Sequence, residues 1–220
     1  KDGLTVGEVS ETKAKRTARP PFTTSTLQQT ASSRLGFSPS RTMQAAQKLY
    51  EQGHITYMRT DSVNLAQEAV DEIRALITER YGKANVPDKP NVYKTKSKNA
   101  QEAHEAIRPT VAAQTPESVK DHLSADQQKL YDLIWKRTVA CQMIPATLAT
   151  VSVDLAAGEG NIFRATGSTV VDPGFMMVYQ EGVDDSKAEE DERLLPALAV
   201  GDRIDLVKVR PEQHFTEPPP

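Results

Sequence analysis

The hydrophobic pattern of this chain changes at Pro145, and that change limits what the chain can fold into. Before Pro145, apolar residues recur every three or four positions, for example within 43–50, which is the spacing of one helix face. After Pro145, apolar and polar residues alternate in short runs such as 151–155 and 204–209. The sequence therefore predicts an α+β fold in which a helical block precedes a β-rich block.

Helix start and stop signals bound four segments of the helical block. Each segment starts beside Ser, Asp or Pro and ends before Gly or Pro, the residue types that favour those positions. The expected helices cover 25–35, 39–52, 62–81 and 125–141. Asp61 or Ser62 is expected to cap the third of them.

Shorter elements are expected between and after these helices. Residues 54–60 are rich in β-branched and aromatic types and predict a strand, while 100–108 show a helical pattern that Pro109 stops. Residues 1–23 are polar and Thr-rich, and a basic cluster within them favours a solvated linker. This cluster consists of Lys13, Lys15, Arg16 and Arg19, before Pro20. Strands in the β-rich block are expected at 151–155, 162–165, 169–171, 175–179 and 204–209.

Charge and composition exclude several classes of protein. The chain has 27 Lys and Arg against 30 Asp and Glu, a net charge of −3, so it is not a generally basic polyanion binder. Residues 145–220 carry a net charge of −8 and the remainder +5, so a polyanion would prefer the first part. No apolar run approaches the roughly 20 residues of a membrane span. Cys141 is the single cysteine, which excludes an internal disulfide and a Cys-cluster zinc site and favours the cytoplasm.

Tyr57 and Arg59 form the pattern with the most specific chemistry. On a strand, residues two positions apart point to the same face. A tyrosine phenol, with a pKa of about 10, is a poor nucleophile at neutral pH. A neighbouring guanidinium favours the phenolate and can bind phosphate oxygens, which suits attack by tyrosine on a phosphodiester. The alternative is a buried tyrosine beside an exposed arginine on an ordinary strand, and the spacing alone favours that alternative.

The complete segment around Tyr57 favours the catalytic interpretation instead. Gly53-His-Ile-Thr-Tyr-Met-Arg-Thr-Asp-Ser62 strongly resembles the active-site segment of the type IA DNA topoisomerases of bacteria. Further stretches fit motifs of that family in the same order, and the resemblance covers nearly the whole chain. These stretches are 20–29, 35–38, 41–43, 102–109 and 214–220.

The resemblance implies roles for individual residues. Tyr57 matches the tyrosine that attacks one DNA strand and becomes joined to the 5′ phosphate, and Arg59 matches the arginine that positions the scissile phosphate. His104 matches a histidine that contacts the DNA backbone near the cleavage site. Arg108 would share a helix face with His104 and add a phosphate contact. The alternative is a core helix in which Glu105 or the backbone satisfies His104.

Three further residues are weaker candidates. Asp61 either caps the following helix, which is the expected role, or orients Arg59 through an ion pair. Arg34 and Arg41 lie near helix ends and could contact DNA phosphates, although a solvated surface position is an equal alternative.

The resemblance also implies an architecture. A mostly helical, winged-helix-like domain at 24–144, carrying Tyr57, would be inserted into a β-rich arch or hinge domain formed by 1–23 and 145–220 of a toroidal enzyme. The chain lacks an initial Met and ends in three prolines, so we expect a fragment of a larger protein. The family binds Mg²⁺ through acidic residues of a separate Toprim domain. No matching acidic pattern occurs here, so no metal site and no cofactor are expected in this chain.

The expected function follows from the same resemblance. The full enzyme would relax negatively supercoiled DNA by transient single-strand cleavage through a 5′-phosphotyrosyl intermediate, strand passage and religation, without ATP. Its partners would be a single-stranded segment of that DNA and the remaining domains of the same polypeptide. A cytoplasmic, nucleoid-associated monomer with no membrane contact is expected. The fragment alone would not cleave DNA. Alternatives are a non-catalytic DNA-binding module and a structural hinge in which Tyr57 is packed and silent.

Overall fold

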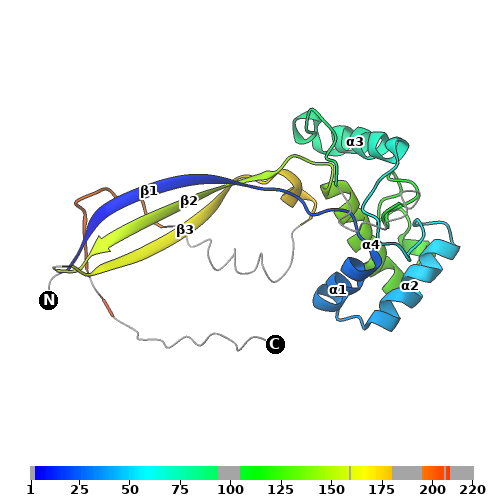
Figure 1. Ribbon diagram of the computed structural model, residues 1–220, viewed down its shortest axis with the longest axis horizontal. Helices are drawn as coiled ribbons and strands as arrows, with labels where there is room; N and C mark the ends of the chain where they lie inside the picture. The colour runs from blue at the N-terminus through cyan, green and yellow to red at the C-terminus, as the bar shows by residue number, and fades with distance from the viewer. Residues whose placement is uncertain (1–2, 94–104, 159, 180–194, 206, 209–220) are drawn as a thin grey trace. The chain divides into compact units, whose positions relative to one another are not determined.

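The computed structural model describes residues 3–93, 105–158, 160–179, 195–205 and 207–208, and these form a mixed α/β chain (Figure 1). The chain divides into two compact units. The helical unit comprises the described residues of 14–148 and 170–189. The sheet unit comprises those of 1–13, 149–169 and 190–220.

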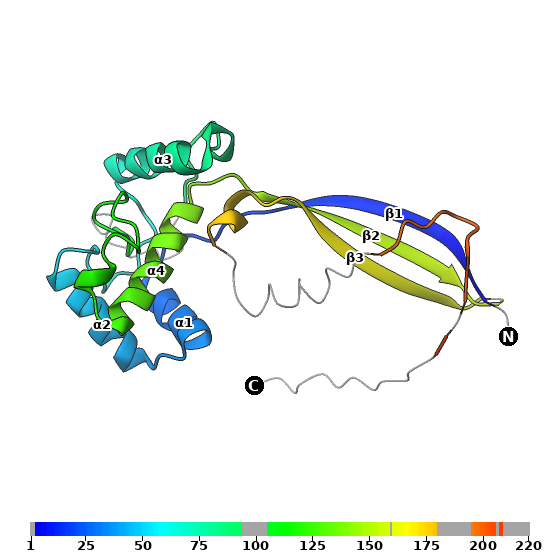
Figure 2. The same ribbon diagram turned by 180° about the vertical axis from the view of Figure 1, so that it is seen from behind.

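Four strands form one sheet in the order β3-β2-β1-β4. Figure 2 shows β1, β2 and β3 side by side. The strands are β1 (Leu4–Arg16), β2 (Ala146–Ala156), β3 (Ile162–Asp172) and β4 (Arg203–Ile204). β1 and β4 are antiparallel, with Leu4 opposite Ile204. The basic cluster at 13–19 favoured a linker, and β1 shows that this prediction was wrong as far as Arg16.

Side-chain pairs set the register between β2 and β3. Along β2 the paired side chains advance by two residues while their partners on β3 step back by two, which is the pattern of an antiparallel hairpin. The pairs are Thr150 with Ser168 at 3.0 Å, Ser152 with Thr166 at 3.4 Å and Asp154 with Arg164 at 2.7 Å. The turn is closed by the Ala157 N–H, which donates to the Asn161 carbonyl oxygen at 2.9 Å.

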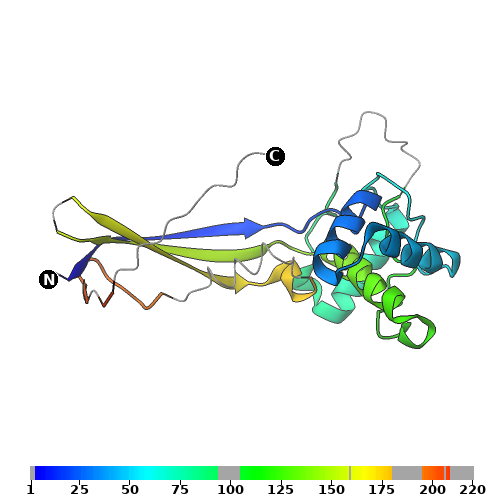
Figure 3. The same cartoon turned by 90° about the horizontal axis from the view of Figure 1, so that it is seen from below.

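The helical unit is built around α4, which packs against the other three helices (Figures 1 and 3). The helices are α1 (Thr24–Leu35), α2 (Pro39–Glu51), α3 (Gln67–Tyr81) and α4 (Ala125–Ala140). Capping boxes begin α1 at Thr23 and α4 at Ser124. Gly36, with φ 65°, ends α1 in the left-handed conformation that glycine adopts without steric cost. Buried apolar side chains of all four helices form one core.

Arg137 of α4 holds two distant segments of the helical unit together. Its Nε donates to the Pro20 carbonyl oxygen at 2.7 Å, and its guanidinium lies over the ring of Phe22 at 4.8 Å. It also lies over the ring of Tyr179 at 5.5 Å. The cationic side chain of Arg137 is therefore buried against a carbonyl oxygen and aromatic faces. These contacts replace the interactions with water that the guanidinium loses on burial.

The segment 175–179 is not the strand that its sequence predicted. Gly174–Met177 form a 3₁₀ turn, and Phe175 and Tyr179 are each only 2% exposed within the core of the helical unit. The Phe175 N–H donates to the Ile144 carbonyl oxygen at 3.0 Å. Packing on the helices therefore overrides the local preference for a strand, and residues 170–179 group with the helical unit. The resemblance predicted a domain at 24–144 inserted into a second domain formed by 1–23 and 145–220. These domain bounds stay a prediction.

Candidate active site

The segment that carries Tyr57 is a loop between α2 and α3, and the strand predicted at 54–60 is wrong. Ile55 makes one isolated bridge, to Pro109. Thr56 fixes the same contact, because its N–H donates to the Arg108 carbonyl oxygen at 2.9 Å and its hydroxyl donates to the Ala106 carbonyl oxygen at 2.7 Å. The pairing stops after one bridge because the Arg108 N–H, which the next pair would need, donates to the Thr56 hydroxyl at 3.0 Å.

The first residue of α1 holds the loop on its other side. The Thr24 hydroxyl donates to the Met58 carbonyl oxygen at 2.8 Å and accepts from the Thr60 N–H at 2.9 Å. The Thr24 N–H donates to the Thr60 carbonyl oxygen at 2.9 Å. Met58 and Thr60 are buried, while Tyr57 and Arg59 are exposed. The loop thus alternates like a strand over 57–60 and presents both candidate side chains outward.

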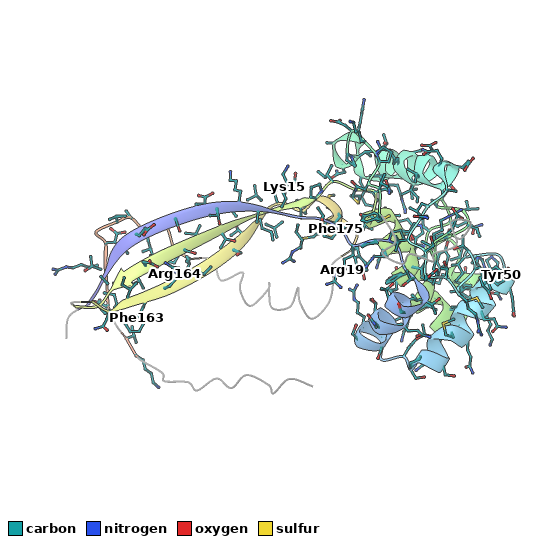
Figure 4. The ribbon with its side chains drawn as sticks, in the orientation of Figure 1. Lys15, Arg19, Tyr50, Phe163, Arg164 and Phe175 are labelled. Atoms are coloured by element: carbon teal, nitrogen blue, oxygen red, sulfur yellow. The ribbon has the colours of Figure 1, made fainter. Side chains whose placement is uncertain are left out.

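Tyr57 is 47% exposed, and its ring meets the ring of Tyr50 edge-on, with centroids 5.3 Å apart. Tyr50 stands at the surface of the helical unit (Figure 4). Arg59 is exposed and has no hydrogen bond or ion pair with any residue that the structure describes. The site therefore combines an accessible phenol with a guanidinium whose donors are available to a ligand.

Asp61 does not cap α3, and neither does Ser62, so that prediction is wrong. The helix begins at Gln67, and its N-cap residue Ala66 donates its N–H to Glu105 Oε1 at 2.6 Å. A distant carboxylate therefore accepts a hydrogen bond from the N-cap residue of the helix. Asp61 is exposed, and within the described parts of the chain it forms no ion pair with Arg59.

His104 lies outside the described residues, and Arg108 occupies an extended segment. Residues 105–108 are not helical. The predicted helix therefore does not extend to Arg108. Ile107 instead bridges to Phe22. The Arg108 guanidinium donates to Glu105 Oε2 at 2.8 Å and to the Pro109 carbonyl oxygen at 2.9 Å, and its side chain is 14% exposed. Contact of His104 or Arg108 with phosphate stays a prediction.

Arg34 and Arg41 both have partners within the helical unit. Arg41 forms a two-point ion pair with Asp126, with Nε and Nη2 each 2.7 Å from a carboxylate oxygen. These hydrogen bonds hold the pKa of Asp126 below its ordinary value. The Arg34 guanidinium lies 4.9 Å from the ring centre of Tyr179. Their proposed phosphate contacts stay predictions.

Sequence reasoning missed three residues of the site. Thr24 positions the loop, Tyr50 contacts the Tyr57 ring, and Glu105 accepts a hydrogen bond from the N-cap residue of α3. Only Thr24 carries a local signal, since it follows the N-cap Thr23 of α1. Thr24 and Glu105 act through contacts distant in sequence, and the contact of Tyr50 with Tyr57 depends on the turn between them, so a single sequence does not reveal these roles.

No group of three or more His, Cys, Asp and Glu side chains within the described ranges could hold a metal ion. In the same part of the chain, no helix is long and apolar enough to cross a membrane.

The family model for DNA topoisomerases matches residues 1–220 of this chain. The chain belongs to the DNA topoisomerase family. The DNA topoisomerase 1 of Xylella fastidiosa is 56% identical over 228 residues, which cover 99% of this chain and 28% of the relative. The DNA topoisomerase 1 of Rickettsia bellii is 49% identical over 224 residues, which cover 98% of this chain and 28% of the relative. This chain thus spans less than a third of the length of these topoisomerases.

A solved structure agrees with this assignment. The full-length topoisomerase I of Thermotoga maritima superposes with a TM-score of 0.77 at 38% identity, over 93% of this chain and 33% of that chain. This topoisomerase chain therefore shares both sequence and fold with bacterial type I enzymes.

Proposed function

We propose that this chain is the tyrosine-bearing part of a type IA DNA topoisomerase, in which Tyr57 cuts one DNA strand. The observation that carries the proposal is that the Tyr57 phenol and, two residues further along the same loop, the Arg59 guanidinium are both exposed, and that Arg59 has no partner among the described residues. Loop contacts to Thr24 and Thr56 hold the backbone on both sides of this pair. The alternative of a packed, silent Tyr57 does not fit a side chain that is 47% exposed.

The proposed reaction is a reversible transesterification. The Tyr57 oxygen attacks the phosphorus of a phosphodiester, an O–P bond to tyrosine forms, and the bond to the 3′ oxygen breaks. The phenolic proton is lost and the leaving 3′ oxygen gains one, so protons balance. Attack by the 3′ hydroxyl on the phosphotyrosine reverses every step. Because one ester replaces another, neither water nor ATP is consumed.

Arg59 has the role of holding the phosphate and stabilising its charge. A guanidinium offers paired N–H donors that match two phosphate oxygens. Negative charge on those oxygens increases in the transition state, so donors fixed beforehand lower the barrier. Arg59 can supply them because no ion pair within the described residues competes for its donors.

Magnesium does not fit the described residues of this chain, which contain no metal-binding cluster. We therefore assign no step to a metal here, and we propose that Mg²⁺ belongs to a Toprim domain of the complete enzyme. The same proposal includes relaxation of negatively supercoiled DNA, a single-stranded DNA segment as substrate, the remaining domains as partners, and a cytoplasmic monomer. The isolated chain is expected not to cleave DNA.

A chimera tests this function. In the Xylella chimera, this chain replaces the matching segment of the Xylella fastidiosa DNA topoisomerase 1, to which it is 56% identical. We expect the chimera to relax negatively supercoiled plasmid without ATP, and Tyr57→Phe to remove that activity. A folded chimera that binds DNA but does not relax it, while the parent enzyme does, would contradict the proposal.

A further inference from the structure

We propose that Tyr50 is a positioning residue for Tyr57, whose edge-to-face contact holds the phenol in the orientation needed for attack on phosphorus. This inference rests on the proposed function. Its basis is the contact between the two rings, with centroids 5.3 Å apart and planes at 69°. Aromatic pairs at this distance and angle are attractive beyond the area they bury.

The position of Tyr50 is fixed by the end of α2. Tyr50 is the penultimate residue of the helix, and its carbonyl oxygen accepts from the Gly53 N–H at 2.9 Å. The His54 N–H donates to the Leu49 carbonyl oxygen at 2.8 Å. Gly53 has φ 78°, which lets the chain reverse tightly there. The helix end and the loop start therefore form one rigid turn that sets where the Tyr50 ring stands.

The side chain of Tyr57 has few other restraints. The hydrogen bonds of Thr24 and Thr56 fix the loop backbone, but they leave the torsions of the Tyr57 side chain free. Its hydroxyl has no hydrogen-bond partner among the described residues. An exposed ring on a loop samples several rotamers unless a neighbour restricts it. Tyr50 is the aromatic neighbour that the described structure provides.

The ring of Tyr50, and not its hydroxyl, makes this contact. The Tyr50 hydroxyl also has no hydrogen-bond partner in the described ranges. Phenylalanine should therefore replace Tyr50 without loss, whereas an aliphatic side chain should not. Reacting groups gain much of their rate from being held in place, so a looser phenol slows cleavage without weakening DNA binding.

A competing interpretation is that Tyr50 stacks on a DNA base. Exposed aromatic rings near a cation are the usual platforms for single strands, and Tyr50 is 42% exposed. The two roles affect different quantities. Stacking acts on the dissociation constant for a single strand, whereas positioning acts on the rate of covalent attachment once DNA is bound.

The test uses the Xylella chimera with Tyr50→Phe, Tyr50→Leu and Tyr50→Gln. Phe163→Leu is the matched control, because Phe163 is also an exposed aromatic residue but belongs to β3. For each variant, the dissociation constant of a single-stranded oligonucleotide and the single-turnover rate of adduct formation are measured at saturating DNA. Thermal unfolding confirms that each variant is folded.

We expect Tyr50→Leu and Tyr50→Gln to slow adduct formation by roughly 3- to 10-fold, from the strength of an aromatic pair, with unchanged DNA affinity. Tyr50→Phe and Phe163→Leu should stay within about 2-fold of the chimera. Unchanged rates in all variants would overturn the proposal, as would a loss that appears entirely in the dissociation constant. A chimera with native Tyr50 that binds DNA but forms no adduct would overturn the proposed function itself, and the positioning role with it.

Discussion

The Thr24 hydroxyl joins α1 to the loop on both sides of Arg59, because it donates to the Met58 carbonyl oxygen at 2.8 Å and accepts from the Thr60 N–H at 2.9 Å. One side chain thus fixes the backbone on which both candidate reactive groups stand. The contact spans distant parts of the sequence and gives the N-terminal end of α1 a role in placing Tyr57.

Replacing Thr24 with valine should lower stability and activity together. Valine keeps the shape but leaves the Met58 carbonyl oxygen and the Thr60 N–H without their partner, which costs about 1–3 kcal/mol in the free energy of unfolding. Urea unfolding of the chimera measures this loss, and adduct formation should slow as the loop loosens. Thr30→Val on the same helix is the control, since the Thr30 hydroxyl has no partner among the described residues. Equal effects of the two substitutions would contradict the role of Thr24.

Arg59→Ala should slow DNA cleavage without destabilising the fold. Arg59 is exposed and forms no ion pair with any described residue, so the folded state loses little when its side chain is removed. Loss of one group that stabilises transition-state charge slows such reactions by about 10²–10³-fold. Arg59→Lys should recover part of this rate, because lysine keeps the charge but not the paired donors. Single-turnover cleavage by the chimera measures both variants.

The control for Arg59 is Arg80→Ala, which removes another exposed arginine, on α3. Equal cleavage rates for the Arg59 and Arg80 variants would show that Arg59 contributes only general charge.

The stability of the helical unit should fall at alkaline pH through Cys141. Burial raises the pKa of this thiol to about 12. In an unfolded chain the thiol ionises near pH 8.5, so above that pH the folded state keeps a proton that the unfolded state has lost. The stabilising contribution is complete below about pH 8 and decreases as the pH rises toward 12.

Urea unfolding at a series of pH values from 8 to 11 measures this dependence. Burial raises the pKa of Tyr131 as well, so part of the decline has another source. Cys141→Ala should show a shallower decline than the unchanged protein, and the difference between the slopes isolates the thiol. If stability declined with pH equally steeply in the two proteins, the thiol of Cys141 would not be a source of the decline.

The sequence predicted the helices well where the signals are local. Gly36 ends α1, Ser38 and Pro39 begin α2, and Ser124 begins α4, as predicted. These residues act on their own backbone, so a single sequence contains the information.

The failures all involve partners distant in sequence. α3 begins later than predicted, and its N-cap residue donates to Glu105 instead of being Asp61 or Ser62. The loop at 54–60 is not a strand, since the Arg108 N–H of its partner segment donates to the Thr56 hydroxyl instead of extending a ladder. Residues 175–179 pack on the core instead of forming a strand. Strand alternation predicted only that Tyr57 and Arg59 share a face, and the spacing alone favoured a buried tyrosine. Both side chains are exposed, on a loop that Thr24 holds in a similar alternation.

The most direct test of the central claim is covalent capture on Tyr57. The Xylella chimera is mixed with a 3′-labelled single-stranded oligonucleotide and Mg²⁺, denatured and digested, and the labelled peptide is identified by mass spectrometry. A tyrosine joined to a 5′ phosphate retains the 3′ part of the strand, so we predict label on the peptide that contains Tyr57 and none in Tyr57→Phe. Label that persists in Tyr57→Phe, or that maps to another residue, would contradict the account.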